Sequence, residues 1–290
     1  MRQLGLLLGL LFGVVAALGA ADRRPRILLS NDDGIAAPGL LAAYEELAKI
    51  GEVTVAAPAE NQSGVGHGIT YREPIMVQAI DPLVKSPGPQ GPPHPPDAVG
   101  RWHRIEAKPA TCVRLALASL LAERPDLVVS GINRGDNAGL SIYVSGTLGA
   151  AREAAFDGIP SIAASQVTWP EMAKGADGYR PGAALLGRVA AVVLKRGLPP
   201  GTFLSLNFPA GEMKGVRVVP HSLRTGLNQY ERRVNPEGET YFWNIWTGPA
   251  DPDPGTDAGS LREGYATVTP LRIDATDREA MRAIEGWGLR

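Results

Sequence analysis

The segment RILLSNDDGIAAPGL, residues 26–40, constrains the fold of this chain more than any other. It opens with a short, branched apolar run typical of a buried strand, and after Pro38 apolar residues recur at helical spacing. Asn31, Asp32 and Asp33 therefore lie in a turn between a strand and a helix. Open α/β sheets bind their ligands at such turns.

The rest of the chain repeats this alternation of strands and helices. Further strands are predicted at residues 53–57, 102–105, 127–130, 161–165 and 203–207, and helices at residues 111–122 and 183–195. The pattern predicts an α/β fold with a Rossmann-like, mostly parallel sheet and helices on both faces.

The neighbouring carboxylates of Asp32 and Asp33 suggest a cation. Like charges so close together raise a pKa or require a positive charge beside them. Oxygen ligands suit Mg²⁺ or Mn²⁺ better than zinc. The alternative is that Asn31 and Asp32 cap the helix or shape the turn. The acidic pair by itself leaves both interpretations open.

Composition excludes several classes of protein. The 290 residues carry 29 Lys and Arg against 30 Asp and Glu, so the net charge of −1 gives no electrostatic reason for nucleic-acid binding. A hydrophobic content of 44% excludes a disordered chain. The single cysteine, Cys112, cannot form a disulfide within the chain and is predicted to be a small buried apolar residue.

The N-terminus is typical of a secretory signal. Arg2 precedes an apolar run at residues 4–18 and the small residues 19–21. We therefore expect a signal peptide at residues 1–21, a folded domain at residues 22–290, and a periplasmic or extracellular location. No stable membrane span is expected after cleavage, although an uncleaved anchor is the alternative.

Two polar loops follow later predicted strands. Residues 59–70 contain Ser63, whose hydroxyl could join the two carboxylates around an ion, and His67, which could donate a proton or hold a phosphate oxygen. Both could equally be ordinary loop residues. Residues 130–139, SGINRGDNAG, contain Asn133 and Asn137, and such a segment can complete a metal shell and cradle an anion.

A third segment, residues 143–151, leads into a helix rich in small residues. Ser145, Gly146 and Thr147 would place hydroxyls and free backbone N–H groups at a helix N-terminus, which attracts phosphate. The alternative is that Ser145 is simply the N-cap.

Two regions depart from the alternating pattern. Residues 81–98 are dense in proline and glycine and predict a surface insertion. Residues 211–270 predict a C-terminal β-hairpin arm with strands at 216–219, 241–246 and 265–269. Because Phe242, Trp243 and Trp246 cannot be buried locally, the arm must fold back on the core or pack on a partner subunit.

Taken together, ILLSNDDGIAAPGL, PAENQSGVGHGIT, VVSGINRGDNAG, YVSGTLGAAREAAFDGIPSIAAS and TDAGSLREGYATVTPL resemble the SurE survival-protein family of metal-dependent nucleotidases. These blocks stand in the family's order from about residue 26 to residue 271. The resemblance implies one divalent ion per subunit, Mg²⁺ or Mn²⁺, held by Asp32, Asp33, Ser63 and Asn133.

The resemblance also implies an activity and an assembly. The expected reaction is removal of phosphate from nucleoside 5′-monophosphates by a metal-activated water, and the sequence leaves open whether 3′-monophosphates are also substrates. Asp32 is the candidate catalytic residue. The candidate residues for binding the substrate and its phosphate are Asn31, His67, Asn137, Ser145, Gly146 and Thr147. An exchanged C-terminal arm would form a homodimer or tetramer.

The chain departs from the family at one turn. Ala107, Lys108, Pro109, Ala110 and Thr111 stand where the family has Gly, Thr, Pro and an acidic residue before Cys-Val, and the Pro-rich segment before them is longer. Both changes bear on nucleobase or sugar preference.

Two other classes of protein share some of these features. A receiver domain also opens with an acidic pair, but it needs an aspartate at the end of a later central strand, where this chain has Ser130. A non-catalytic, exported nucleotide- or phosphate-binding protein remains the alternative from another class.

Overall fold

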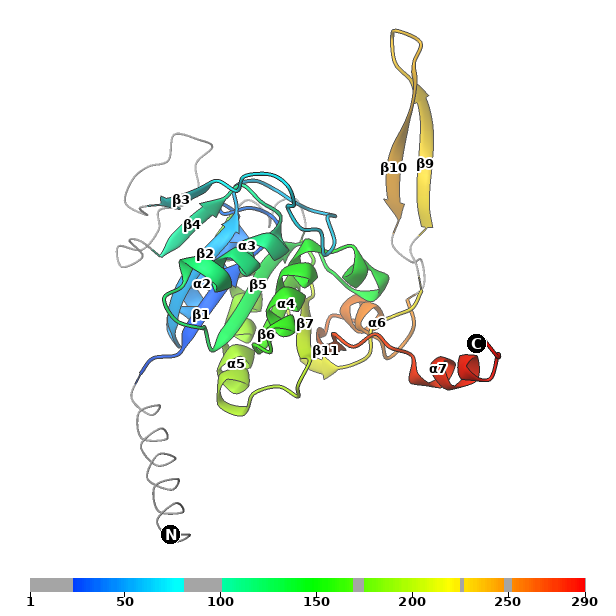
Figure 1. Ribbon diagram of the computed structural model, residues 1–290. Coiled ribbons are helices and arrows are strands. Elements are labelled where there is room, and N and C mark those ends of the chain that lie inside the picture. The colour runs from blue at the N-terminus through cyan, green and yellow to red at the C-terminus, as the bar shows by residue number, and fades with distance from the viewer. Residues whose placement is uncertain (1–22, 81–100, 169–174, 225–226, 248–251, 290) are drawn as a thin grey trace.

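The computed structural model describes residues 23–80, 101–168, 175–224, 227–247 and 252–289. This described part contains a nine-stranded sheet in the order β3-β4-β2-β1-β5-β6-β7-β11-β8 and a separate hairpin, β9–β10 (Figure 1). The strands are β1 (Arg26–Ser30), β2 (Glu52–Pro58), β3 (Val77–Ile80), β4 (Trp102–Ile105), β5 (Leu127–Arg134), β6 (Ser161–Gln166), β7 (Thr202–Phe208), β8 (Val216–Val218), β9 (Leu227–Val234), β10 (Thr240–Thr247) and β11 (Ala266–Arg272). The helices are α2 (Pro38–Leu47), α3 (Pro109–Leu115), α4 (Gly146–Phe156), α5 (Arg180–Arg196), α6 (Asp257–Arg262) and α7 (Arg278–Glu285).

The direction of the strands confirms the predicted fold class. Strands β4, β2, β1, β5, β6 and β7 are parallel, whereas β3 and β11 run antiparallel to β4 and β7. The chain moves outward from β1 through β2 to β4 and then returns to place β5 on the other side of β1. The strand order therefore reverses between β1 and β5, which is where such sheets form a ligand crevice at their carboxyl edge.

Helices cover both faces of the sheet. In β1, Ile27 and Leu29 belong to the core that includes α2 and α5, whereas Leu28 belongs to the core that includes α3 and α4. All three side chains are buried, since alternate residues of a strand point to opposite faces. This two-sided burial explains the continuous apolar run in the sequence, and each such leucine contributes roughly 2 kcal/mol of stability.

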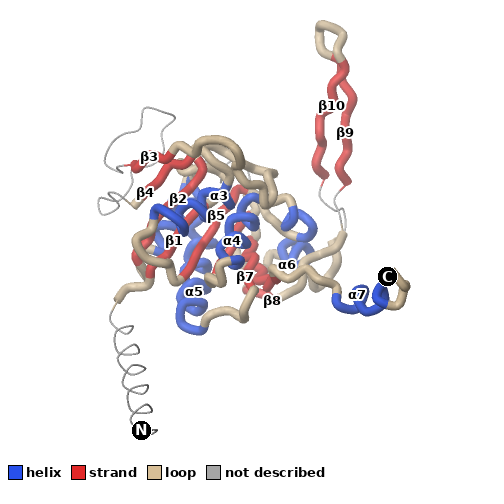
Figure 2. The backbone as a smooth tube through the Cα atoms, in the orientation of Figure 1, coloured by secondary structure: helices blue, strands red, loops and turns tan. Residues whose placement is uncertain are grey.

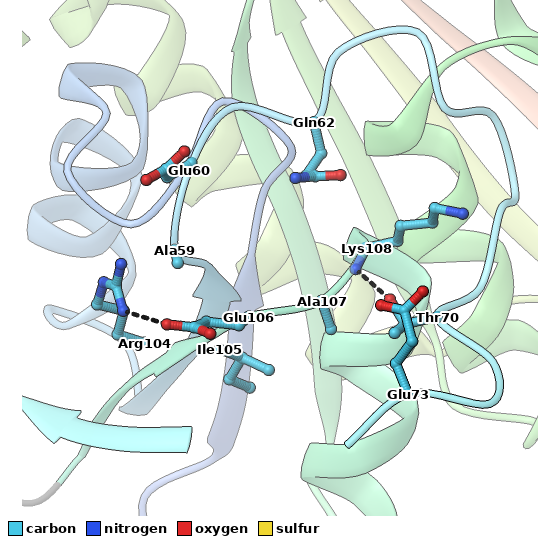
Figure 3. A pocket seen from close by; sticks show the side chains of 10 residues that line it. All are labelled: Ala59, Glu60, Gln62, Thr70, Glu73, Arg104, Ile105, Glu106, Ala107 and Lys108. Atoms are coloured by element: carbon cyan, nitrogen blue, oxygen red, sulfur yellow. Dashed lines mark hydrogen bonds and ion pairs between the residues drawn. The ribbon is translucent and has the colours of Figure 1, made fainter. Parts of the chain in front are cut away.

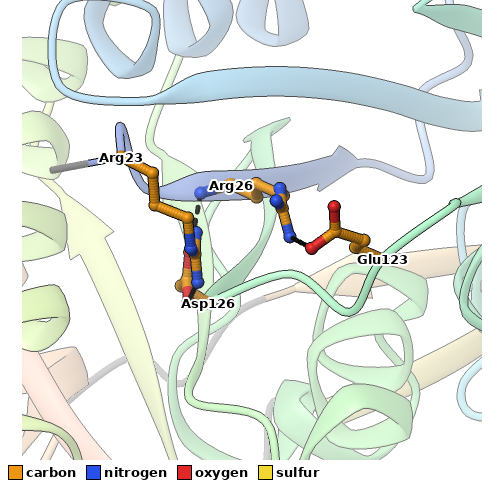
Figure 4. Close-up of polar contacts among 4 residues, drawn as sticks. All are labelled: Arg23, Arg26, Glu123 and Asp126. Atoms are coloured by element: carbon orange, nitrogen blue, oxygen red, sulfur yellow. Dashed lines mark hydrogen bonds and ion pairs between the residues drawn. The ribbon is translucent and has the colours of Figure 1, made fainter. Parts of the chain in front are cut away.

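Polar contacts fix the amino end of β1 (Figure 4). Asp126, just before β5, accepts hydrogen bonds from the Arg26 backbone N–H at 2.8 Å and from the Arg23 guanidinium at 2.7 and 2.8 Å. Arg26 also pairs with Glu123. Exposed ion pairs of this kind add little stability, but the backbone contact helps to set the register between β1 and β5.

Several element boundaries differ from the predicted ones. Strand β5 continues past Ser130 to Arg134 through a register shift against β6, so Asn133 lies on a strand and not in a loop. Helix α3 begins at Pro109, since proline suits the first turn of a helix, and is followed by a π-helical turn over Ala116–Leu120. The predictions omitted β3, β9, α6 and α7.

The β9–β10 hairpin stands away from the sheet (Figures 1 and 2). Phe242 and Trp243 on β10 are 60% and 58% exposed. This hairpin therefore does not fold back on the core, which leaves packing on a partner as the other expectation. The other two strands predicted for the arm, β8 and β11, instead pair within the main sheet. The side chain of Trp246, the predicted signal peptide and the Pro-rich insertion at residues 81–98 lie outside the described residues. In the described part of the chain, no helix combines the length and apolarity that crossing a membrane requires.

Candidate functional site

The acidic pair lies at the carboxyl end of β1, at the reversal point of the sheet. Asp33 Oδ2 accepts a hydrogen bond from the backbone N–H of Arg134, at the end of β5, at 2.7 Å. Asp32 Oδ1 accepts one from the Thr147 hydroxyl, in the first turn of α4, at 2.5 Å. The two carboxylates therefore join β1 to β5 and to α4.

Burial changes the acidity of both groups. Burial and the neighbouring charge of Asp32 together raise the pKa of Asp33 to about 7. Burial also raises the pKa of Asp32, although hydrogen bonds from the Thr147 hydroxyl and from backbone N–H groups of Thr147 and Gly146 act in the opposite direction. A bound cation would offset both effects, because it stabilises the ionised form of the two carboxylates.

The loop after β2 is attached to the same place. The backbone N–H of Gln62 donates to the Asp32 carbonyl oxygen at 2.7 Å, so Ser63 is one residue from this contact. The Ser63 backbone N–H donates to Asn61 Oδ1 at 2.8 Å, and Ser63 is exposed. The structure thus brings the predicted serine to the neighbourhood of Asp32, as the order of the strands requires.

Asn133 is buried near the end of β5. Its Nδ2 donates to the Gly135 carbonyl oxygen at 2.8 Å, which leaves Oδ1 as an acceptor. Asn133 directly precedes Arg134, whose N–H contacts Asp33. The extension of β5 therefore places this predicted ligand next in the chain to the residue that contacts Asp33.

Asn31 and Asn137 lie deeper. Asn31 is fully buried and its Nδ2 donates to the Gly34 carbonyl oxygen at 2.8 Å. Among the described residues, Asn31 Oδ1 has no hydrogen-bond partner. Asn137 Nδ2 donates to Ser165 Oγ at 2.8 Å, and the Asn137 N–H donates to Asn207 Oδ1 at the same distance. Asn137 is thus held in a buried polar network that the sequence did not reveal.

The first turn of α4 packs directly on Asp32. Ser145 is the N-cap, and its hydroxyl accepts a hydrogen bond from the Leu148 N–H at 3.2 Å, so the capping interpretation is correct for this residue. A Cβ atom on Gly146 would lie 2.8 Å from Asp32 Cβ. The glycine is therefore required for this close approach, and the predicted phosphate contacts of Ser145, Gly146 and Thr147 stay predictions.

His67 makes a different set of contacts. Its Nε2 lies 2.7 Å from Glu153 Oε2, and its ring stacks on Phe156 with centroids 5.2 Å apart. Glu153 is buried on α4 and also accepts a hydrogen bond from Arg114 Nε at 2.5 Å. The described contacts of His67 are thus with α4 and not with Asp32. Sequence reasoning missed the role of Glu153, although a charged residue among small apolar ones signals a buried partner.

The four predicted metal ligands form a set that fits a hard cation. Two carboxylates, a hydroxyl and a side-chain amide supply oxygen donors only, and the unpartnered acceptor of Asn31 adds another buried oxygen nearby in the chain. Within the described residues there is no cluster of three or more His, Cys, Asp or Glu side chains that could hold a metal. Because all the donors in the predicted set are oxygen atoms, the set fits Mg²⁺ or Mn²⁺ better than zinc.

Cys112 is fully buried, as predicted. Burial raises the pKa of its thiol, so the thiolate needed for nucleophilic attack is disfavoured.

Comparison with known proteins places the chain in a family. The model of the family described as "Survival protein SurE" matches residues 27–229. The chain is 39% identical over 271 residues to a protein of Rhodopirellula baltica named "5'-nucleotidase SurE", covering 91% of this chain and 99% of that protein. It is 41% identical over 261 residues to "5'-nucleotidase SurE 1" of Thermus thermophilus, covering 90% and 97% of the two chains.

A solved structure supports the same assignment. The crystal structure of SurE protein from Aquifex aeolicus is similar with a TM-score of 0.76 at 33% identity, and the match covers 91% of this chain and 99% of that one. The sequence match and the structural match each extend over most of both chains. This chain therefore belongs to the SurE family.

Proposed function

We propose that the protein is an exported, divalent-metal-dependent 5′-nucleotidase. The observation that carries the proposal is the attachment of two separate segments to the acidic pair. Arg134, next to Asn133, contacts Asp33, and Gln62, next to Ser63, contacts Asp32. These contacts support a meeting of the predicted ligands at the reversal point of the sheet. The relatives named 5′-nucleotidase match along almost their whole length, which supports the same reaction here.

The proposed roles of the site residues follow from these contacts. Asp32, Asp33, Ser63 and Asn133 would hold one Mg²⁺ or Mn²⁺ ion. When bound, the ion would polarise a phosphoryl oxygen and make a water molecule more acidic. Because Thr147 occupies Oδ1 of Asp32, Oδ2 is the atom that would accept the proton of the attacking water.

Other residues would bind the phosphate and the rest of the substrate. Asn137, Ser145, Gly146 and Thr147 lie around the first turn of α4, where the positive end of the helix dipole favours negative charge. Asn31 and His67 complete the predicted set, His67 from its position against Glu153. Hydrolysis of 3′-monophosphates belongs to the same proposal.

The assembly and location extend the proposal beyond the site. An isolated two-stranded hairpin is marginally stable in water, so the projecting β9–β10 arm supports a homodimer or tetramer. The apolar N-terminal run supports export.

The test is phosphate release from nucleotides. We expect AMP hydrolysis with Mn²⁺ or Mg²⁺, loss of activity with EDTA, and recovery on adding metal. Asp32→Asn should lower kcat at least about 100-fold with an unchanged circular dichroism spectrum, because it removes the general base. Asp177→Asn, at an exposed side chain, is the matched control.

Two outcomes would argue against this function. Near-normal turnover in Asp32→Asn would remove the catalytic assignment. Nucleotide binding without phosphate release under any metal would favour the non-catalytic binding protein.

A further inference from the structure

A pocket of about 450 Å³ lies at the carboxyl ends of β2 and β4 (Figure 3). Figure 3 shows Thr70, Glu73 and Lys108 on one side of it and Glu60, Arg104 and Glu106 on the other, with Gln62 between them. Its volume lies within the range of small-molecule sites. None of the four predicted metal ligands lines it, so it is a space separate from the proposed metal centre.

One backbone hydrogen bond and one chain neighbour connect the pocket with the proposed centre. Gln62, in the pocket lining, donates its backbone N–H to the Asp32 carbonyl oxygen at 2.7 Å. On the other side of the pocket, Lys108 precedes Pro109 in the chain. A Cβ atom placed on Gly146 would lie 3.2 Å from Pro109 Cγ and 2.8 Å from Asp32 Cβ, so Pro109 lies close to the acidic pair. A phosphate at the acidic pair therefore has this pocket as a neighbouring space for its ester group.

The charges in the pocket select the chemistry of that group. Glu106 pairs with Arg104 at 3.2 Å. Glu60 and Glu73 are exposed, and neither makes a side-chain hydrogen bond or ion pair with another described residue. Unpaired carboxylates accept hydrogen bonds and do not donate them. They therefore suit a neutral group rich in hydroxyls and disfavour a second anionic group.

We infer that this pocket binds the nucleoside part of a nucleoside monophosphate, with Glu60 and Glu73 accepting hydrogen bonds from the ribose hydroxyls. The inference rests on the proposed function, since it takes the phosphate to lie at the acidic pair. It assigns Glu60 and Glu73 a role in sugar recognition, so that ribose is preferred over a sugar without hydroxyls.

A second pocket provides the competing location. It has a volume of about 430 Å³, lies beyond the ends of β6 and β7, and is lined largely by apolar residues that include Pro181 and Met213. Its carboxylates are Asp177 and Glu212. Because it lacks a backbone contact with Asp32, we assign the ribose to the first pocket.

The experiment measures binding apart from turnover. Titration calorimetry with Mg²⁺ would compare adenosine with 2′,3′-dideoxyadenosine, neither of which carries a phosphate to hydrolyse. We expect the wild-type protein to bind adenosine about tenfold more tightly, the size of one charge-assisted hydrogen bond. In the double variant E60A/E73A the preference should fall to about one, while dideoxyadenosine binds as before.

Glu212→Ala is the matched control and should keep the preference. A preference that survives in E60A/E73A, one that is absent from the wild type, or one that is lost in Glu212→Ala would overturn the inference. AMP hydrolysis is measured in parallel on the same proteins. Hydrolysis of AMP without a preference for ribose would contradict this inference but not the proposed function. A preference for ribose that depends on Glu60 and Glu73, without hydrolysis of AMP, would contradict the proposed function but not this inference.

Discussion

At the scale of single residues, the site depends on close approach around Asp32. Its side chain is 3% exposed and lies between β1 and the first turn of α4. The Thr147 hydroxyl holds one carboxylate oxygen, and Gly146 leaves room for the other, since a Cβ there would lie 3.0 Å from Oδ2. The position of the Asp32 carboxylate therefore depends on Gly146 having no side chain.

Gly146→Ala tests this dependence. The added methyl group would displace the Asp32 carboxylate, because real Cβ atoms essentially never approach heavy atoms as closely as 2.8 Å. We expect kcat for AMP to fall at least about tenfold, since small displacements at a catalytic group cost rate steeply.

Gly175→Ala is the control, since a Cβ at Gly175 meets nothing within 4 Å. Full activity in Gly146→Ala would show that Asp32 tolerates displacement, and its catalytic role would then be in doubt.

At the scale of elements, α3 and α4 are joined by a half-buried ionic contact. Glu153 on α4 contacts Arg114 on α3 and His67 in the loop after β2. Burial works to raise the pKa of Glu153, but hydrogen bonds from His67 and Arg114 outweigh it and lower the pKa below its ordinary value of 4.5. The ionised form therefore stabilises this face of the fold.

The pH dependence of stability follows from the direction of the Glu153 pKa shift. A lowered carboxyl pKa contributes stability that is present above pH 4.5 and is lost as the pH falls through the lowered value. In EDTA, Glu153→Gln should cost about 2 kcal/mol of unfolding free energy at pH 7. Its difference from the wild type should shrink below pH 4.5, as measured by urea unfolding.

The exposed Glu279 on α7 provides the control, Glu279→Gln, which should change stability little at any pH. A difference between Glu153→Gln and the wild type that stays constant down to pH 3 would show that the Glu153 charge does not stabilise the fold.

At the scale of the whole molecule, the structure combines a sheet covered by helices on both faces with a projecting arm. The nine-stranded sheet buries its apolar residues under helices, whereas β10 exposes Phe242 and Trp243. Exposed apolar side chains of this size are typical of interaction surfaces. Because a projecting strand pair has little core of its own, contact with another copy would bury these rings.

The arm predicts a measurable change in assembly. The double variant F242E/W243E should shift the sedimentation mass toward the monomer, because burying two charges on an interface is costly. Glu237→Lys, at the turn of the hairpin, should leave the mass unchanged. An unaltered mass in F242E/W243E would remove the arm from the interface.

Export is the second prediction at this scale. Expressed in a bacterial host that exports proteins, the full chain should be recovered outside the cytoplasm. Its mature N-terminus should lie near residue 22, since small residues precede this position. N-terminal sequencing would check the cleavage point, and recovery of the intact chain in the membrane fraction would favour an uncleaved anchor.

Local pattern was enough to predict the parallel part of the sheet and the main candidates of the site. The apolar runs of β1 and β5 are buried on both faces, so their periodicity and length were informative without knowledge of neighbours. Asp32 and Asp33 follow the first strand directly, and their position at the carboxyl edge follows from the parallel alternation alone. These inferences depend on short stretches of chain.

Contacts between distant segments were decided only by tertiary structure. The pairing of His67 with Glu153 spans 86 residues, and that of Asp33 with the Arg134 N–H spans 101. No local pattern encodes which loop meets which helix, because packing of the whole sheet brings them together. For the same reason the extension of β5 through Asn133, the close contact of Gly146 with Asp32, and the projection of the arm became visible only in the folded chain.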